Sequence, residues 1–174
     1  MYFPYLYGRR AERNALIDVA PSLASKQKVH PIVEPYSPAS DLTKLLDAYK
    51  AAGAKLHLVV NPARGGLITG PAQAAWAIEM APYVAQSALI TPVMHLHAAT
   101  TNTELSAFLS HFKNRDVALV VLNSGLSPLG IAAAIGSRAV RVFTGQKVEA
   151  QDYSTALPNQ KVGRPVLRFP INVT

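Results

Sequence analysis

The sequence predicts an α/β fold of parallel βα repeats in a barrel-like arrangement, an incomplete or shortened TIM-type barrel. Short apolar runs alternate with segments of helical period through residues 1–144, which is the signature of βαβ units around a parallel sheet. The runs are apolar on both faces, as central parallel strands covered by helices are. The chain has 174 residues, the size of one ordinary domain. We therefore expect a single α/β domain over residues 1–174.

Six strands are expected from the apolar runs. Each run is short and rich in β-branched, aromatic or leucine residues, which fit a buried strand better than a long helix. In chain order the runs are residues 2–7, 29–34, 56–61, 89–95, 117–123 and 139–144.

Five helices are expected between these strands, because the segments there have a helical apolar period. Thr101 and Glu104 stand at capping-box spacing. Ser127 precedes a proline and is expected to cap a helix. Pro21 and Pro82 are expected to break or kink two of the helices. In chain order the predicted helices are residues 11–24, 40–53, 71–86, 101–112 and 127–136.

The last part of the chain differs from the repeats. Residues 145–174 are mostly polar and read as an irregular C-terminal segment. Only the stretch VLRFPINV, residues 166–173, resembles a further strand. It is expected at an edge of the sheet, because Pro170 has no N–H to donate to a neighbouring strand.

The spacing of the strands limits the architecture. The six strands begin at intervals of roughly 22 to 33 residues, a period that (β/α)₈ barrels share, but eight units usually need about 200 residues or more. The chain is therefore expected to form a barrel-like sheet that lacks one or two units. The alternative is an open doubly wound sheet. We prefer the barrel because most strands end in polar residues, as a ring around a site would.

Composition excludes several classes of protein. The absence of cysteine excludes disulfides, thiol nucleophiles and cysteine-bound zinc, and it is compatible with the cytoplasm. The start has the wrong order of charge for a secretory signal, and no apolar run approaches the roughly 20 residues of a membrane span. No serine stands in a G-x-S-x-G context. The net charge of +7 is spread along the chain and suggests an acidic partner only weakly.

A functional site is expected where the strands end, because βα loops converge at the carboxyl edge of a parallel sheet. The expected catalytic residues are Glu34, His95 and Arg9, with Arg9 standing beside Glu34. Residues that can bind a ligand follow the same strands. They are Arg10, Asn61, Arg64, His97, Asn123, Ser124 and Gly125.

Glu34 is the most specific candidate. A carboxylate at the end of an apolar strand and next to an arginine suits a general base or a metal ligand, but a structural salt bridge gives the same pattern. With His95 and His97 it would form a metal set. Loop or core histidines are commoner than ligands, so we assign no metal and name no cofactor.

Two glycine-containing loops are candidate anion-binding sites. ARGGLITG, residues 63–70, matches neither the Walker spacing nor the dinucleotide fingerprint and is expected to be a flexible loop. NSGLSP, residues 123–128, precedes a helix N-terminus, which favours an anion. An ordinary βα turn explains the second loop better than an anion site does.

The opening MYFPYLYGRRAERNAL, residues 1–16, and the PIVEP stretch, residues 31–35, resemble an uncharacterised bacterial family. These are the sce-type proteins with a MYFPYLRG-like N-terminus, related to the phage beta-protein family and often encoded beside predicted nucleases in defence-like gene neighbourhoods. The resemblance implies a barrel-like α/β fold and a role in bacterial defence or conflict. Members are longer, so it also implies a chain shortened on its C-terminal side. It implies no established activity.

Three functions are compatible with these observations. The first is a defence-associated protein whose strand ends bind, and in one version hydrolyse, an anionic ligand such as a phosphate ester. The second is a non-catalytic binding module, such as an immunity protein or an accessory subunit of a toxin or nuclease, or a homodimer. The third is direct nucleic-acid binding, which is the weakest because basic and aromatic residues are not interleaved.

Overall fold

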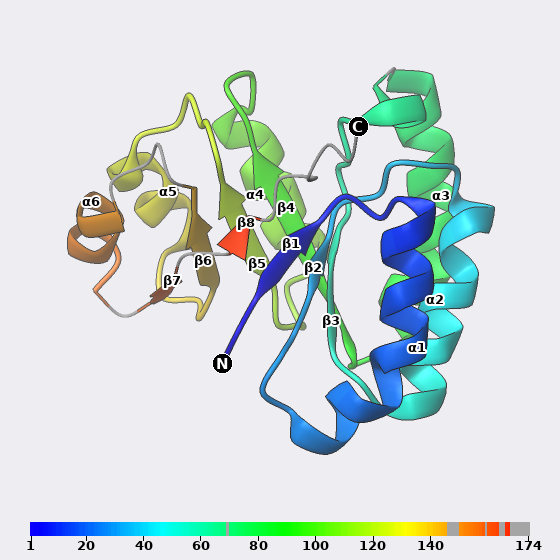
Figure 1. The fold of residues 1–174 in the computed structure, drawn as a ribbon. Coiled ribbons are helices and arrows are strands. Elements are labelled where there is room, and N and C mark those ends of the chain that lie inside the picture. Colours follow the sequence, from blue (N-terminus) through cyan, green and yellow to red (C-terminus); the bar gives the residue numbers. More distant parts are fainter. Residues whose placement is uncertain (69, 146–149, 159, 164–165, 168–174) are drawn as a thin grey trace, which may run out of the picture.

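The computed structural model describes residues 1–68, 70–145, 150–158, 160–163 and 166–167. Strands and helices alternate along this chain (Figure 1). The strands are β1 (Pro4–Leu6), β2 (Ile32–Val33), β3 (Leu56–Val59), β4 (Ile90–Leu96), β5 (Ala118–Val121), β6 (Arg141–Thr144), β7 (Lys161–Gly163) and β8 (Val166–Leu167). The helices are α1 (Arg10–Lys26), α2 (Ala39–Ala52), α3 (Gly70–Gln86), α4 (Asn102–His111), α5 (Pro128–Ile135) and α6 (Ala150–Ala156), with a short 3₁₀ helix η1 (Gly65–Leu67).

All eight strands form one parallel sheet. Their order is β7-β6-β5-β4-β3-β2-β1-β8, and every pairing is parallel. A doubly wound sheet reverses its order part-way, whereas this order is sequential from β1 to β7. The doubly wound alternative is therefore wrong. The sheet is curled and barrel-like, and β8 lies beside β1 (Figure 1).

The helices pack on the outer face of the curled sheet in two groups. Helices α1, α2 and α3 cover β2 and β3 through residues such as Leu45, Trp76 and Leu58. Helices α4, α5 and α6 cover β5 and β6, and Figure 1 shows the two groups on opposite flanks. Because side chains alternate along a strand, neighbouring residues such as Leu119 and Val120 belong to the outer and inner sides of the sheet.

The inner face has its own apolar layer. Its buried members come from β1 to β6 and their ends, and are Tyr5, Ile32, Val59, Val93, Ala118, Val120 and Phe143. As in small barrels, these side chains fill the interior by packing on one another. Polar groups lie on this face above and below the layer, at the two ends of the strands.

The predicted repeats are confirmed, with shorter strands than expected. Each of the six predicted runs contains a strand, and the five predicted helices all form. The Thr101–Glu104 capping box and the Ser127 cap are present. Helices α1 and α3 continue through Pro21 and Pro82, so the expectation of breaks there was wrong. Within the described residues, no helix has the length and apolar character needed to cross a membrane.

The C-terminal segment corrects the prediction of an irregular stretch. It contains α6, β7 and the two residues of β8. Tyr153 and Leu157 are buried against the α4–α5 layer, so two apolar anchors hold a segment that is otherwise polar. Strand β8 lies at the end of the sheet order, as expected for an edge strand. Residues 168–173 of the predicted strand lie outside the described residues.

Candidate functional site

Glu34 lies fully buried at the carboxyl end of β2, on the inner face of the sheet. Its backbone N–H donates to the Leu6 carbonyl at 2.8 Å, which keeps Glu34 in register with β1. A carboxylate without solvent needs compensating partners, because burial of an unpaired charge is very costly. Three side chains from three different segments supply them.

The first two partners share one carboxylate oxygen. The hydroxyl of Tyr5 donates to Oε2 of Glu34 at 2.7 Å, and Nε of Arg64 donates to the same oxygen at 3.1 Å. The third partner is His95, whose Nδ1 lies 3.6 Å from Oε1. Neither Oε1 nor Nδ1 has a hydrogen-bond partner among the described residues. The carboxylate is thus fixed through one oxygen and faces an imidazole with the other.

These contacts determine the charge of the site. Burial by itself raises the pKa of Glu34, but His95, the Tyr5 hydroxyl and Arg64 outweigh it, and the pKa is lowered from 4.5. Burial raises the pKa of Tyr5 well above its usual value, and the Glu34 charge raises it further. At neutral pH the site therefore holds a carboxylate and a neutral phenol.

Arg64 reaches Glu34 from the loop after β3. Its guanidinium lies over the Tyr7 ring, 4.6 Å from the centroid, and its side chain stays 45% exposed. The following residue, Gly65, has a φ of +57°, and a Cβ there would lie 2.4 Å from the Tyr36 carbonyl oxygen. Only glycine allows this loop to approach Tyr36 so closely. We call the set Tyr5, Tyr7, Glu34, Arg64 and His95 the Glu34 cluster.

Asn61 holds the end of β4 in place. The ladder between β3 and β4 includes a bond from Val60 N–H to the Val93 carbonyl, and residue 62 would donate the next one to His95. Pro62 has no N–H to donate. The Asn61 amide takes over instead: Nδ2 donates to the His95 carbonyl and Oδ1 accepts from the His95 N–H, both at 2.8 Å. Asn61 therefore positions His95.

The two arginines after β1 lie apart from Glu34. Arg9 stacks over the Tyr36 ring at 5.2 Å, and with Arg10 it lines a groove of about 710 Å³ between the starts of α1 and α2. The cation on Glu34 is Arg64. The expected placement of Arg9 beside Glu34 was therefore wrong, because Gly8 directs the chain outward into α1. Tyr36 lies between the groove and the Arg64 loop.

The remaining candidates lie over β4 and β5. The rings of His95 and His97 are 6.1 Å apart. Ser124 accepts a hydrogen bond from the N–H of Leu126, so its hydroxyl shapes the turn. A Cβ on Gly125 would lie 2.5 Å from the Ala98 carbonyl oxygen, which brings the loop of residues 123–127 against that of His97. Asn123, which is exposed, begins this loop.

Sequence reasoning missed Tyr5, Tyr7 and Arg13. The two tyrosines belong to a predicted strand, and the parity of Phe3, Tyr5 and Tyr7 places all three on the inner face with Glu34. Arg13 is buried and donates to the Gly8 carbonyl at 2.6 Å, with Asp41 3.3 Å away. Its position on a helix gave no signal of this role.

The chemistry available in the Glu34 cluster is acid–base chemistry beside a half-exposed cation. Among the described residues no three histidine or acidic side chains are grouped as metal ligands, so the Glu34, His95 and His97 set does not assemble in this part of the chain. Comparison with models of protein families, with curated proteins and with solved structures finds no match to this chain.

Proposed function

We propose that the Glu34 cluster is an acid–base site for a small phosphate ester. The observation that supports it is the pairing of His95 Nδ1 with Glu34 Oε1 at 3.6 Å, where neither atom has another partner in the part of the chain that the structure describes. A buried carboxylate that faces one nitrogen of an imidazole orients the ring and stabilises its cation, leaving the other nitrogen for proton transfer. Such contacts are often long without substrate and shorten in the complex.

In this proposal His95 is the general base. Its Nε2 takes a proton from water as the water oxygen attacks phosphorus, and the P–O bond to the alcohol breaks. The same proton then passes to the leaving oxygen, so the products are an alcohol and inorganic phosphate. Arg64 neutralises charge on the phosphoryl oxygens, and its 45% exposure leaves donors for the ligand while Nε remains on Glu34.

The cationic groove beside the cluster supports an anionic substrate. Arg9, Arg10 and Lys44 line it, and Asp41, which faces them, is paired with Arg13. Because Tyr36 separates the groove from the Arg64 loop, a substrate whose phosphate reaches Arg64 would extend over Tyr36. Positive charge along that path raises the local concentration of anions.

Release of inorganic phosphate from a panel of phosphomonoesters tests the proposal. We expect the intact protein to release phosphate, and His95→Gln and Glu34→Gln to lower kcat by about 10²- to 10⁴-fold. His111→Gln, an exposed histidine on α4, is the matched control. Circular dichroism checks that each variant is folded. Full activity in folded His95→Gln contradicts the role of His95.

A second candidate is a non-catalytic binding module. Strand β7 ends the sheet order, and β6 is its only partner among the described strands. An edge of this kind can pair with a strand of another protein or of a second copy. Light scattering after size-exclusion chromatography separates the possibilities. We expect the protein to form a complex or dimer under this candidate. Loss of that complex or dimer in Val162→Pro, with the fold and the packing of Val142 retained, favours the binding module.

The setting of this function is a proposal of the same kind. The sequential strand order from β1 to β7, with β8 beside β1, supports a shortened TIM-type barrel. The absence of cysteine supports the cytoplasm. The resemblance of residues 1–16 and 31–35 to sce-type proteins supports a role in bacterial defence. Deletion of the gene in its host, followed by phage challenge, tests that role: unchanged phage resistance contradicts it.

A further inference from the structure

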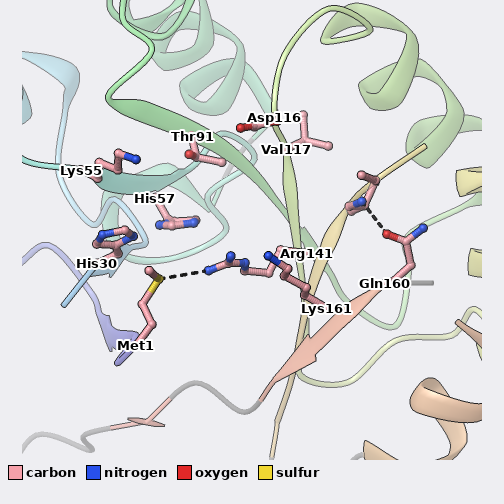
Figure 2. Close-up of a pocket in the computed structure, with 12 residues that line it drawn as sticks. Met1, His30, Lys55, His57, Thr91, Asp116, Val117, Arg141, Gln160 and Lys161 are labelled. Atoms are coloured by element: carbon pink, nitrogen blue, oxygen red, sulfur yellow. Dashed lines mark hydrogen bonds between the residues drawn. The ribbon is translucent and has the colours of Figure 1, made fainter. Parts of the chain in front are cut away.

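A second ionisable site lies at the amino ends of the strands, below the apolar layer and opposite the Glu34 cluster. A cavity of about 340 Å³ opens there, within the lower part of the range of about 300–1,000 Å³ typical of small-molecule sites. Figure 2 shows its lining side chains, which come from the starts of several strands. The ionisable ones are His30, Lys55, His57, Asp116, Arg141 and Lys161. We call this the amino-end pocket.

The charges in the amino-end pocket do not balance. Lys55, Arg141 and Lys161 are cations, and Asp116 is the one acidic residue in the lining. Within the described part of the chain, none of the three cations forms an ion pair. Arg141 instead lies over the Phe3 ring, 4.7 Å from its centroid, with its NH1 3.6 Å from the Met1 sulfur. Three cations that converge on a cavity with one acidic residue favour an anion there.

His57 provides an independent sign of a ligand. It is only 6% exposed and lines the cavity, and its Nδ1 has no hydrogen-bond partner within the described residues. Buried polar atoms are nearly always satisfied, so an exception needs an explanation. Figure 2 shows the imidazole between Lys55 and Arg141. An oxygen placed among these three side chains would satisfy all of them.

We propose that the amino-end pocket binds the phosphate group of a small phosphorylated molecule, through Lys55, Arg141 and Lys161, with His57 at its base. This site is separate from the Glu34 cluster and does not depend on the function proposed for it. A second cavity of about 320 Å³ shares Arg141 and Lys161 with the first and is also lined by Phe3 and Phe143. The ligand is therefore a phosphate joined to an apolar or aromatic group.

The imidazoles give this site a pH dependence. Burial, together with the charges of Arg141, His30 and Lys55, lowers the pKa of His57 to about 3. Burial, Lys55, Arg141 and the amino terminus lower the pKa of His30. Asp116 and Lys161 complete the charged lining. A bound anion reverses the sign of the local field, so it raises the pKa of both imidazoles and couples binding to their protonation.

Phenylphosphonate is a suitable probe, because its P–C bond resists hydrolysis, and benzyl alcohol is its uncharged control. We expect phenylphosphonate to shift the His57 ring resonances in NMR spectra and to raise the His57 titration midpoint by about one unit or more. Benzyl alcohol should do neither.

Two variants complete the test. Lys55→Met and Arg141→Gln should each weaken phenylphosphonate binding about tenfold or more, the loss of one charge-assisted contact. Lys113→Met, an exposed lysine after α4, should bind like the unmodified protein. Unchanged His57 resonances at saturating phenylphosphonate overturn the proposal. So does equal affinity in folded Arg141→Gln, or binding of a polynucleotide at this pocket without binding of phenylphosphonate.

Discussion

The Tyr5 hydroxyl donates a 2.7 Å hydrogen bond to the Glu34 carboxylate, and both side chains are almost completely buried. The bond joins β1 to the end of β2 on the inner face of the sheet, where no helix covers them. Each residue makes burial of the other tolerable. The phenol contributes a donor to a charge, and the charge satisfies a hydroxyl that would otherwise be unpaired.

Removal of this hydroxyl should destabilise the protein. Tyr5→Phe leaves the ring packing intact but removes one of the three partners of Glu34, so we expect the free energy of unfolding to fall by about 1.5–3 kcal/mol. Urea denaturation measures it. Tyr2→Phe, which removes a hydroxyl from an exposed ring on the same segment, should change stability by less than about 0.5 kcal/mol. Equal effects of the two variants contradict the prediction.

His57 should make stability depend on pH between 6.5 and about 3. Its folded-state pKa of about 3 lies below the ordinary value of 6.5. As the pH falls through this range, the unfolded chain binds a proton that the folded protein does not. The contribution of His57 is therefore complete above pH 6.5 and is lost progressively as the pH falls toward 3.

Stability measured across this range in the unmodified protein and in His57→Phe isolates the effect. The slope of the unmodified protein should exceed that of the variant by up to about 1.4 kcal/mol per pH unit. His111→Gln, on the surface of α4, should keep the full slope. A slope unchanged by His57→Phe contradicts the depressed pKa.

Gly65 and Gly66 form a matched pair for the Arg64 loop. An alanine at 65 meets both a φ of +57° and the Tyr36 carbonyl at 2.4 Å, whereas a Cβ at 66 finds nothing within 4 Å. We expect Gly65→Ala to cost about 1–3 kcal/mol and to displace Arg64 from Glu34. Gly66→Ala should be nearly neutral. Thermal unfolding compares the stabilities of the two variants. Similar melting temperatures for both contradict the prediction.

Arg138 should be a major stabiliser of the outer layer. Its guanidinium donates to the carbonyls of Leu109, Phe112 and Arg115 at 2.5–2.6 Å, which lie in the last turn of α4 and in the loop after it. Arg138→Met removes these bonds and a cation at a helix C-terminus, so we expect a loss of about 2–4 kcal/mol. Chemical denaturation measures the loss, with Lys113→Met as the surface control. A loss below about 0.5 kcal/mol contradicts this role.

The repeats could be predicted because their signals are local. Apolar runs and helical period depend on the neighbours in the sequence, and the Thr101 and Ser127 caps need only residues within one turn. The C-terminal segment could not be predicted in the same way. Helix α6 is held by Tyr153 and Leu157 against other helices, a tertiary effect that overrides weak local preference.

The site was predicted at the level of the sheet edge but not of its contacts. Glu34, Arg64 and His95 do meet there. Arg64, and not Arg9, is the partner of Glu34 because of the direction in which the chain leaves β1. The presence of Gly8 in the sequence does not reveal that direction. The amino-end pocket was not predicted, because ligand sites of parallel sheets are expected at the carboxyl ends of the strands.

At Asn61 a side-chain amide replaces a backbone hydrogen bond of the sheet, and this affects how the Arg64 loop can vary. The Asn61 amide closes the ladder on His95, so the sheet is complete before the chain turns away at Pro62. We therefore expect that insertions or substitutions in the loop after Pro62 leave β4 and the orientation of His95 unchanged. The sheet thus holds the His95 imidazole in a fixed position, while the Arg64 loop can vary and determine which ligand reaches it.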